Sequence, residues 1–359
     1  MTNRPEVKKP IDEDPGLRLR QRFFSVPTLI AYGVAIGVLV LALSKVFEIN
    51  WSETWALINS TDPVLYALAV LIYYTSFWFR GARWVILARS GNLDSKVGVR
   101  LPSPHLAALI ILMGWFANSV AFMRLGDAYR ALAFSRKSGA SFAATLGSVL
   151  GERAQDMAIV LALLLLATIF IITSGKHSIS PWVVLTAASL VLMMMALLLG
   201  MRLFGLRIAS RFHPRFQSAY MSFQSGALAG FRTKKLPLQL MLGTIAWILE
   251  SLRLYLVAHG IGLDLDLSVA IFVALAAAML STIPTPGGFG FVESGLTGLL
   301  LFLGLPNSDA LALTLVDRSI AWLSVIVIGG IVFFAWQVLN SNRKHLEISD
   351  TFDSSVSDP

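Results

Sequence analysis

Two acid–arginine pairs interrupt strongly apolar sequence and are the residues best suited to chemistry. Glu152 precedes Arg153 within "SFAATLGSVLGERAQDMAIVLALLLL", and Asp317 precedes Arg318 within "ALALTLVDRSIAWLSVIVIGG". Asp156 adds another carboxylate near the first pair. Charges inside apolar helices are costly, and they mark either a polar site for an ionic ligand or a buried ion network that clamps helices together. If the helices begin elsewhere, the charged side chains could instead snorkel to the membrane surface. The sequence leaves these explanations open.

The composition indicates an integral membrane protein. The 359 residues are 56% hydrophobic and 14% charged, with a mean hydropathy of +0.70, whereas soluble domains carry about 25% charged residues. The absence of cysteine excludes disulfides, thiolate metal sites and a cysteine nucleophile. A net charge of +8 indicates cytoplasmic loops and contact with anionic lipid rather than nucleic acid.

Runs of roughly 20 apolar residues predict full transmembrane helices. Six segments qualify: Pro27–Phe47, Pro63–Trp84, Ser141–Thr173, Pro181–Phe204, Leu236–His259 and Ser308–Val338. The distribution of Lys and Arg places both termini in the cytoplasm, with Glu53 and Asp264 outside. We therefore expect a multi-pass protein of the cell (plasma) membrane.

Two further regions are predicted to be re-entrant helical hairpins. Pro104–Ser138 begins and ends on the expected inner side, and Leu267–Leu305 on the outer side. The second is broken at "STIPTPGGFGFVESG", where Gly287, Gly288 and Gly290 allow unusual backbone geometry. This break is either a tight turn alone or a turn whose backbone donors face an anion. Glu293 then either caps those donors or titrates beside them.

Weak internal similarity predicts an inverted repeat. When Gly139 is placed over Gly304, the pair Glu152–Arg153 falls on Asp317–Arg318, and just upstream Gly126 falls on Gly290. We expect an all-α polytopic membrane protein with two inverted repeats, each with three spans and one re-entrant hairpin. The expected divisions are a cytoplasmic tail (1–23), repeat 1 (24–175), repeat 2 (176–340) and a disordered cytoplasmic tail (341–359).

Helix geometry places the acid–arginine pairs near mid-membrane. At about 1.5 Å per residue, Glu152 and Arg153 lie roughly 16 Å into a helix that begins near Ser141, within a core about 30 Å thick. Neighbours at i,i+1 do not face each other, so these two residues need different partners on other elements. Arg153 and Asp156, at i,i+3, are spaced to meet.

Other charged residues have simpler explanations. Arg80, Arg83, Glu250 and Arg253 are expected to snorkel at the membrane interface, with contact to a lipid headgroup as the alternative. The basic interval Arg207–Lys235 is either an amphipathic helix on the inner surface or a solvated loop.

Three sequence elements resemble a known family. "RLGDAYRALAFSRKSGASFAATLGSVLGERAQD" and "PTPGGFGFVESGLTGLLLFLGL" are similar to the signature regions of the lysylphosphatidylglycerol synthase transmembrane-region family, also called flippase-like. The shared elements are Gly-Asp-x-x-Arg, Glu-Arg-x-x-Asp and Pro-Gly-Gly-x-Gly-x-x-Glu. In aminoacyl-phosphatidylglycerol proteins this region accompanies a cytosolic aminoacyl-transferase domain, and in some archaeal relatives a glycosyltransferase domain. Neither is expected here, so the resemblance implies lipid handling without the synthase.

The predicted function is that of a lipid flippase or transporter, not an enzyme. Its ligand would be an anionic phospholipid or a polyprenyl-phosphate-linked lipid. The expected headgroup-binding residues are Arg130, Arg153, Arg318, Gly287, Gly288 and Gly290. The expected charge-balancing or proton-coupling residues are Asp127, Glu152, Asp156, Glu293 and Asp317.

Two other functions remain open at this level. The protein could instead be a non-transporting partner that presents lipid to a separate aminoacyl- or glycosyltransferase. An intramembrane lipid-modifying enzyme is less favoured, because no nucleophile with an adjacent base is visible. No cofactor, metal or nucleic acid is expected.

Overall fold

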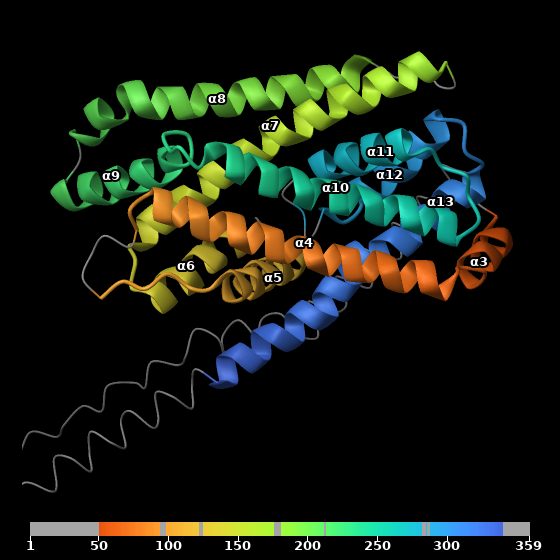
Figure 1. The fold of residues 1–359 in the computed structure, drawn as a ribbon, viewed down its shortest axis with the longest axis horizontal. Helices are drawn as coiled ribbons and strands as arrows, with labels where there is room; N and C mark the ends of the chain where they lie inside the picture. Colours follow the sequence, from red (N-terminus) through yellow and green to blue (C-terminus); the bar gives the residue numbers. More distant parts are fainter. Residues whose placement is uncertain are drawn as a thin grey trace, which may run out of the picture. The chain divides into compact units, whose positions relative to one another are not determined.

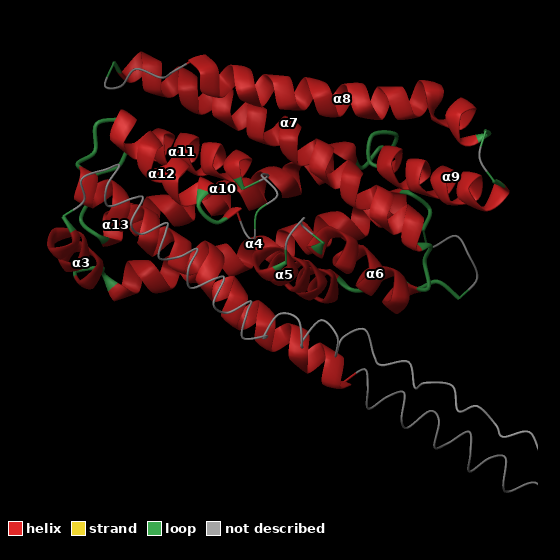
Figure 2. Cartoon of the chain, turned by 180° about the vertical axis from the view of Figure 1, so that it is seen from behind, coloured by secondary structure: helices red, strands yellow, loops and turns green. Residues whose placement is uncertain are grey.

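The computed structural model describes residues 50–93, 98–121, 125–175, 181–211, 213–281, 285 and 288–339. All regular secondary structure within these ranges is helical, as Figures 1 and 2 show. Residues Phe47–Phe333 form one compact unit. The expected span Pro27–Phe47, both terminal tails and the predicted site residue Gly287 lie outside the described residues.

Five of the described helices are long and apolar enough to cross a bilayer. They are α4 (Pro63–Ser90), α7 (Phe142–Ser174), α8 (Pro181–Ala209), α10 (Leu236–Gly260) and the continuous helix Asn307–Leu339, which begins with α13 (Asn307–Arg318). They coincide with the five predicted spans that fall within the described residues, so those predictions are confirmed. The chain is a multi-pass helical membrane protein.

Proline and capping side chains determine where several helices begin. Pro63 and Pro104 occupy the first turns of their helices, where a missing N–H leaves no bond unmade. The Asp62 carboxylate caps α4 by accepting a hydrogen bond from the Val64 N–H at 2.7 Å. The end of α7 is also determined by a local residue, because Gly175 adopts the left-handed conformation that stops a helix (φ 68°).

Two pairs of short helices alternate with the long ones. α5 (Pro104–Val120) packs against α6 (Gly126–Ser138), and α11 (Leu267–Leu280) packs against α12 (Phe291–Phe302). At about 1.5 Å per residue, none of the four spans a hydrocarbon core of about 30 Å. Each predicted hairpin region therefore consists of two short helices on either side of a break.

The region expected to be a surface helix or a solvated loop contains α9 (Pro214–Ala229), which packs against α7 and α8. The contact with α7 is close because a Cβ on Gly147 would overlap the backbone of Phe223, and one on Gly226 the backbone of Ala144. The loop alternative is therefore wrong for this segment.

α10 packs against helices of both predicted repeats. It packs along α4 and also contacts α7, α11 and α13, and Figure 1 shows it in the middle of the helices. Because α10 contacts all three helices, it brings the charged residues of α4 and α7 near those of α13. A short N-terminal helix, α3 (Trp51–Asn59), packs against α13.

The helix that carries Arg318 changes its winding directly after that residue. Ser319–Ser324 is a π-helical segment, a distortion that is common at functional sites. Three tyrosines of α4 form hydrogen bonds to it: Tyr66 with Ser319 (2.9 Å), Tyr73 with the Ala321 carbonyl (3.2 Å) and Tyr74 with Ser324 (2.7 Å). α4 therefore supports the segment along its length.

Candidate functional site

A cavity lies among the helices that carry the predicted charged pairs. It has a volume of about 200 Å³ and is lined by residues of α4, α5, α7, α8, α10, α11, α12 and α13. Seven charged side chains reach its wall: Arg80, Arg153, Asp156, Glu250, Arg253, Asp317 and Arg318. Arg153 of the first acid–arginine pair and both members of the second therefore line one space, which is named the central cavity below.

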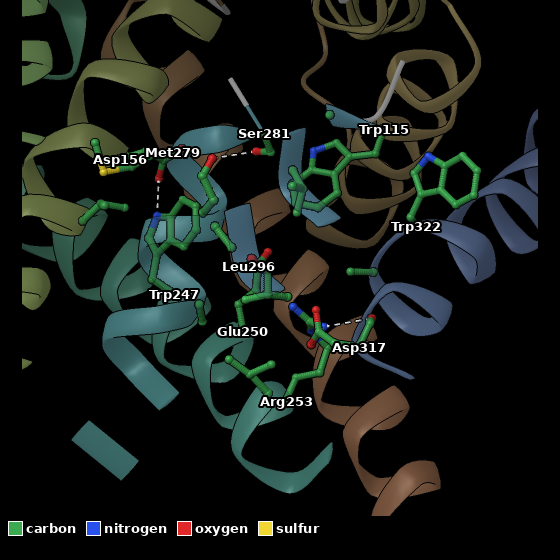
Figure 3. A pocket seen from close by; sticks show the side chains of 18 of the residues that line it. Trp115, Asp156, Trp247, Glu250, Arg253, Met279, Ser281, Leu296, Asp317 and Trp322 are labelled. Atoms are coloured by element: carbon green, nitrogen blue, oxygen red, sulfur yellow. Dashed lines mark hydrogen bonds and ion pairs between the residues drawn. The ribbon is translucent and has the colours of Figure 1, made fainter. Parts of the chain in front are cut away.

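The charged residues enter the central cavity from different helices. Figure 3 shows Glu250 and Arg253 of α10 beside Asp317 of α13. Trp115 and Trp322, also labelled in Figure 3, line the cavity as well. Aromatic and charged groups thus share the polar part of the cavity.

The walls contributed by α8 and α11 are apolar. α8 contributes Ala187, Leu190 and Val191, and α11 contributes small residues such as Ala274 and Ala277. The central cavity is therefore amphipathic, with ionic groups from some helices and only apolar side chains from α8. Such a lining suits a ligand with both a charged and an apolar part.

Glu152 lies in a buried ion cluster. Its carboxylate accepts hydrogen bonds from Arg83 Nη2 at 2.9 Å and from Arg130 Nη1 at 3.0 Å. Arg83 is 0% exposed and also donates to Asp156 Oδ1 at 2.7 Å, which accepts a further bond from Trp247 Nε1 at 3.0 Å. Glu152 and Arg130 are not among the residues that line the central cavity, so this cluster holds α4, α6 and α7 together.

Arg153 has a different and more accessible partner. Its Nη2 donates to Asp127 Oδ1 at 2.9 Å, and the two side chains are 26% and 25% exposed. The expectation that Glu152 and Arg153 use partners on other elements is confirmed. The expected contact between Arg153 and Asp156 is not formed as an ion pair, because Asp156 is held by Arg83.

The second pair is organised in the same way. Asp317 is ion-paired with Arg253 of α10. Arg318 Nε donates to Glu293 Oε1 at 2.7 Å. The other oxygen of Glu293 accepts a hydrogen bond from the Gly290 N–H at 2.7 Å, so Glu293 caps α12 and holds Arg318 at once.

The two sets of ion pairs correspond to each other. In each set the acid of a long helix pairs with an arginine of an earlier span, and the following arginine pairs with an acid in the first turn of a short helix. The corresponding pairs are Arg83–Glu152 with Arg253–Asp317, and Asp127–Arg153 with Glu293–Arg318. Side chains that are distant in sequence thus repeat one local arrangement.

Three arginines of α4 and α10 are buried in the protein rather than placed at an interface. Arg80, Arg83 and Arg253 are 2%, 0% and 6% exposed, so the snorkelling prediction is wrong for them. Arg80 Nη2 contacts Glu250 Oε1 at 2.6 Å, and its guanidinium lies between Trp115 and Trp247, at 5.2 and 4.8 Å from the ring centres. Cation–π contacts of this kind stabilise a buried guanidinium.

The broken stretch between α11 and α12 reaches the central cavity. Ser281, Thr285 and Gly288 line it, and Gly288 has a positive φ of 74°. Gly290 also has a positive φ (87°), but its amide is bonded to Glu293. Of the predicted glycines, Gly288 is therefore the one that borders the cavity within the described residues.

Two uncharged buried donors in the cavity wall have no hydrogen-bond partner among the described residues, as is also the case for Arg80 Nε and Arg253 Nε. The uncharged donors are Trp322 Nε1 and Thr285 Oγ1. Trp322 lies four residues after Arg318, and this helical spacing could have identified it from the sequence. An oxygen-rich ligand in the cavity could accept hydrogen bonds from both.

The sequence reasoning also missed Arg80, Glu250 and Arg253 as cavity residues. The available signal was their position inside the apolar spans of α4 and α10, where a charge marks a functional site by default. No group of three or more metal-ligating side chains occurs among the described residues. The arrangement is suited to binding an anionic or zwitterionic group through arginines and indole donors.

Comparison with known proteins identifies the family. The sequence pattern described as "Lysylphosphatidylglycerol synthase TM region" matches residues 30–329. The chain belongs to this family. The matched region contains both broken segments and both acid–arginine pairs, so the resemblance seen in the sequence is confirmed over most of the chain.

Several known proteins are similar to parts of this chain. A "UPF0104 membrane protein" of Methanocaldococcus jannaschii is 27% identical over 220 residues, which are 61% of this chain and 93% of that protein. A "UPF0104 membrane protein" of Methanothermobacter thermautotrophicus is 25% identical over 337 residues, 88% of this chain and 96% of that protein. "Glycosyltransferase AglD" of Haloferax volcanii is 29% identical over 141 residues, 39% of this chain but 21% of that protein.

Proposed function

We propose that this protein moves a phosphate-bearing lipid between the leaflets of the cell membrane. The observation that carries the proposal is the amphipathic central cavity, to which α4, α7, α10 and α13 contribute charged residues while α8 contributes only apolar ones. The lipid would be an anionic phospholipid or a polyprenyl-phosphate-linked lipid. Its headgroup would enter the cavity while its chains remain against the apolar walls.

The size of the central cavity supports a headgroup as the part that enters. Pockets for drug-sized ligands hold about 300–1,000 Å³, and the central cavity holds about 200 Å³. A headgroup therefore fits more readily than a whole lipid. The lipid chains would stay outside the cavity and contact the apolar residues of α8.

Arg153 and Arg318 are the proposed phosphate ligands. Each lines the cavity and is held by one carboxylate, Asp127 or Glu293. A phosphate can compete for an arginine because charge-assisted bonds to phosphate and carboxylate have similar geometry and strength. Exchange of these partners would let the headgroup enter and leave without a permanent unpaired charge.

The other acidic residues would balance charge or couple protons. Glu152, Asp156 and Asp317 are each held by a buried arginine of α4 or α10. Arg130 belongs to the same buried cluster, and we propose that it supports Glu152 and positions α6. Gly290 would shape the tip that presents Gly288 to the cavity, and a role of Gly287 stays a prediction from the sequence.

We further propose that the molecule is an inverted repeat with two re-entrant hairpins. The correspondence of the four ion pairs supports this, as does the occurrence of one short helix pair before each acid–arginine helix. Inverted repeats place substrate sites at broken helices near the membrane midplane. The end of α5 (Asn118, Ser119) and the tip before α12 (Thr285, Gly288) both border the cavity, as this architecture requires.

A second candidate function is presentation of lipid to a separate aminoacyl- or glycosyltransferase. The similarity to part of "Glycosyltransferase AglD" favours it, because there the matched sequence belongs to a larger protein. In this case the central cavity would hold the lipid for a partner enzyme rather than release it on the other side.

A leaflet-resolved assay tests the proposal. Purified full-length protein is reconstituted into liposomes that contain a fluorescent anionic phospholipid, and label in the outer leaflet is quenched chemically. We expect wild-type protein to make inner-leaflet label accessible and the double variant Arg153→Gln/Arg318→Gln to lose this activity. Arg215→Gln is the matched control, because Arg215 is exposed and does not line the central cavity.

The other outcomes are equally informative. Full activity in the double variant would overturn the assigned phosphate ligands. Inactive wild-type protein that binds the lipid and stimulates an added transferase would favour presentation over transport.

A further inference from the structure

A second cavity, of about 370 Å³, lies between the end of α4, the second half of α8 and α9. It is separate from the central cavity and shares no lining residue with it. Along α8 the two are about 16 Å apart, since Val191 borders the central cavity and Arg202 the second one, eleven residues later. This space is named the α8–α9 cavity below.

Among the described lining residues, the charge of the α8–α9 cavity has one sign. Arg202 and Arg232 line it, and no Asp or Glu is among its described lining residues. Both arginines are exposed, and no ion pair or hydrogen bond joins their side chains to any described residue. Two unpaired guanidinium groups around one hollow form an electrostatic site for an anion.

Neutral polar groups complete the wall. Gln224 Nε2 donates to the Met201 carbonyl at 2.5 Å, which ties α9 to α8 and fixes one side of the cavity. Ser90 is held on the opposite side by Gln239 Nε2 at 3.3 Å. Ser225 is exposed on the cavity wall and can offer its hydroxyl to a ligand. The site is therefore preformed on two sides and open on the third.

Apolar surface continues from the cavity along α8. Leu206 lines the cavity and is 49% exposed, and the neighbouring Leu203 and Phe204 are also exposed. α8 is a candidate membrane span with little of its surface buried, so we expect these side chains to face hydrocarbon. A ligand that joins a phosphate to an acyl chain would match this surface better than a free anion.

We propose that the α8–α9 cavity binds the phosphate-bearing headgroup of an anionic phospholipid. Basic pockets between membrane helices bind such headgroups, and bidentate contact with phosphate is a preference of arginine. The site is independent of the transport proposal, because none of its residues lines the central cavity. A lipid bound there would link α8 to the α9–α10 connection at Arg232.

Thiol protection tests this site in the full-length protein, because the chain has no native cysteine. Ser225→Cys is labelled with a maleimide in nanodiscs of phosphatidylglycerol or of phosphatidylcholine. We expect labelling to be about tenfold slower in phosphatidylglycerol, and the difference to disappear in Arg202→Gln/Arg232→Gln. Adding glycerol 3-phosphate to phosphatidylcholine nanodiscs distinguishes the sources: protection by this soluble compound would show that free phosphate esters occupy the site.

Matched controls separate the site from general surface charge. Ser218 lies two turns earlier on the same face of α9, is exposed and does not line the cavity. Ser218→Cys should therefore be labelled at similar rates in both lipids, with or without the arginine substitutions. Arg211→Gln/Arg215→Gln removes the same charge elsewhere and should preserve the protection. Equal labelling of Ser225→Cys in both lipids, or equal loss of protection in the control double variant, would overturn the proposal.

Discussion

At the scale of single residues, the arginines of this protein differ in how their charge is compensated. Arg83 is fully buried and serves two carboxylates, whereas Arg153 shares one partly exposed carboxylate and borders the central cavity. A buried ion pair is strongly destabilised when one partner is removed, because the other charge stays in an apolar environment. The same residue type therefore stabilises the fold at one position and is available to a ligand at another.

The first prediction concerns Arg83. Arg83→Ala leaves Glu152 and Asp156 without their shared partner, and we expect the free energy of unfolding to fall by about 3–5 kcal/mol. Thermal melting in detergent measures this. Arg215→Ala, at an exposed position, should melt like wild type. Similar melting of the two variants would show that the Glu152 cluster does not clamp the helices.

The second prediction separates the two roles of Glu293. Glu293→Gln keeps an oxygen that can accept the Gly290 N–H bond but removes the charge that holds Arg318. We expect near-wild-type melting, tighter binding of anionic lipid and slower transport, because Arg318 is no longer returned to a partner. Glu293→Ala also loses the cap and should be less stable by about 0.5–2 kcal/mol. Unchanged lipid affinity in Glu293→Gln would argue against Arg318 as a phosphate ligand.

At the scale of elements, broken and distorted helices border the central cavity. The stretch before α12 places Gly288 on the cavity wall, and the π-helical segment places Ala321 and Trp322 there. Regular helices would satisfy all their backbone groups internally, whereas breaks free donors and acceptors inside the protein. Specific side-chain contacts hold these elements, so substitutions can measure how each element contributes to transport or stability.

The third prediction concerns the turn before α12. In Gly288→Ala the new Cβ would meet the Val292 side chain and approach Ser281 Cα at 3.1 Å, at a positive φ. Gly98→Ala is a matched control, because Gly98 has a similar φ of 86° and nothing within 4 Å of a built Cβ. Both variants carry the same backbone strain of about 1–2 kcal/mol. We expect lipid transport to fall only in Gly288→Ala; equal transport in the two would remove Gly288 from the site.

The fourth prediction concerns the tyrosines of α4. Tyr73→Phe removes the hydroxyl that donates to the partly buried Ala321 carbonyl in the π-helical segment, and we expect a loss of about 0.5–1.5 kcal/mol from the missing hydrogen bond. Tyr255→Phe on α10 should have a smaller effect, since no hydrogen bond of the Tyr255 hydroxyl is found among the described residues. Denaturant or thermal melts of the two variants compare them. A loss as large in Tyr255→Phe would show that the tyrosine contacts do not support this segment.

At the scale of the compact unit Phe47–Phe333, packing around α10 gathers charged residues from both halves of the chain at one cavity. The proposed inverted architecture predicts on which side of the membrane each connection lies. It places α3 and the α10–α11 connection outside, and the basic residues between α8 and α10 inside.

The fifth prediction is this topology. Glu53→Cys and Asp264→Cys should react with an impermeant thiol reagent from outside the cell, and Arg215→Cys only after the cytoplasmic side is opened. Asp264 and Arg215 are exposed, so their labelling reports sidedness rather than burial. Labelling of positions 53 and 215 from the same side would contradict the inverted repeat.

The sequence by itself determined the spans, the two breaks and the need to neutralise particular charges. Five expected spans are helices, because lipid requires about 20 apolar residues with all backbone groups bonded internally. The rule that adjacent helical residues face apart was enough to predict separate partners for Glu152 and Arg153. These features follow from local composition and spacing, which any single sequence displays.

Only the tertiary structure decided which partner each charge has. Asp156 follows Arg153 by three residues, about one helical turn, yet it pairs with Arg83 of another helix. Arg80 was expected at an interface, and it lies between Trp115 and Trp247. Such choices depend on the rotation and register of packed helices, to which residues from every part of the interface contribute. For that reason, local spacing identified the charged residues while helix packing selected those that face the central cavity.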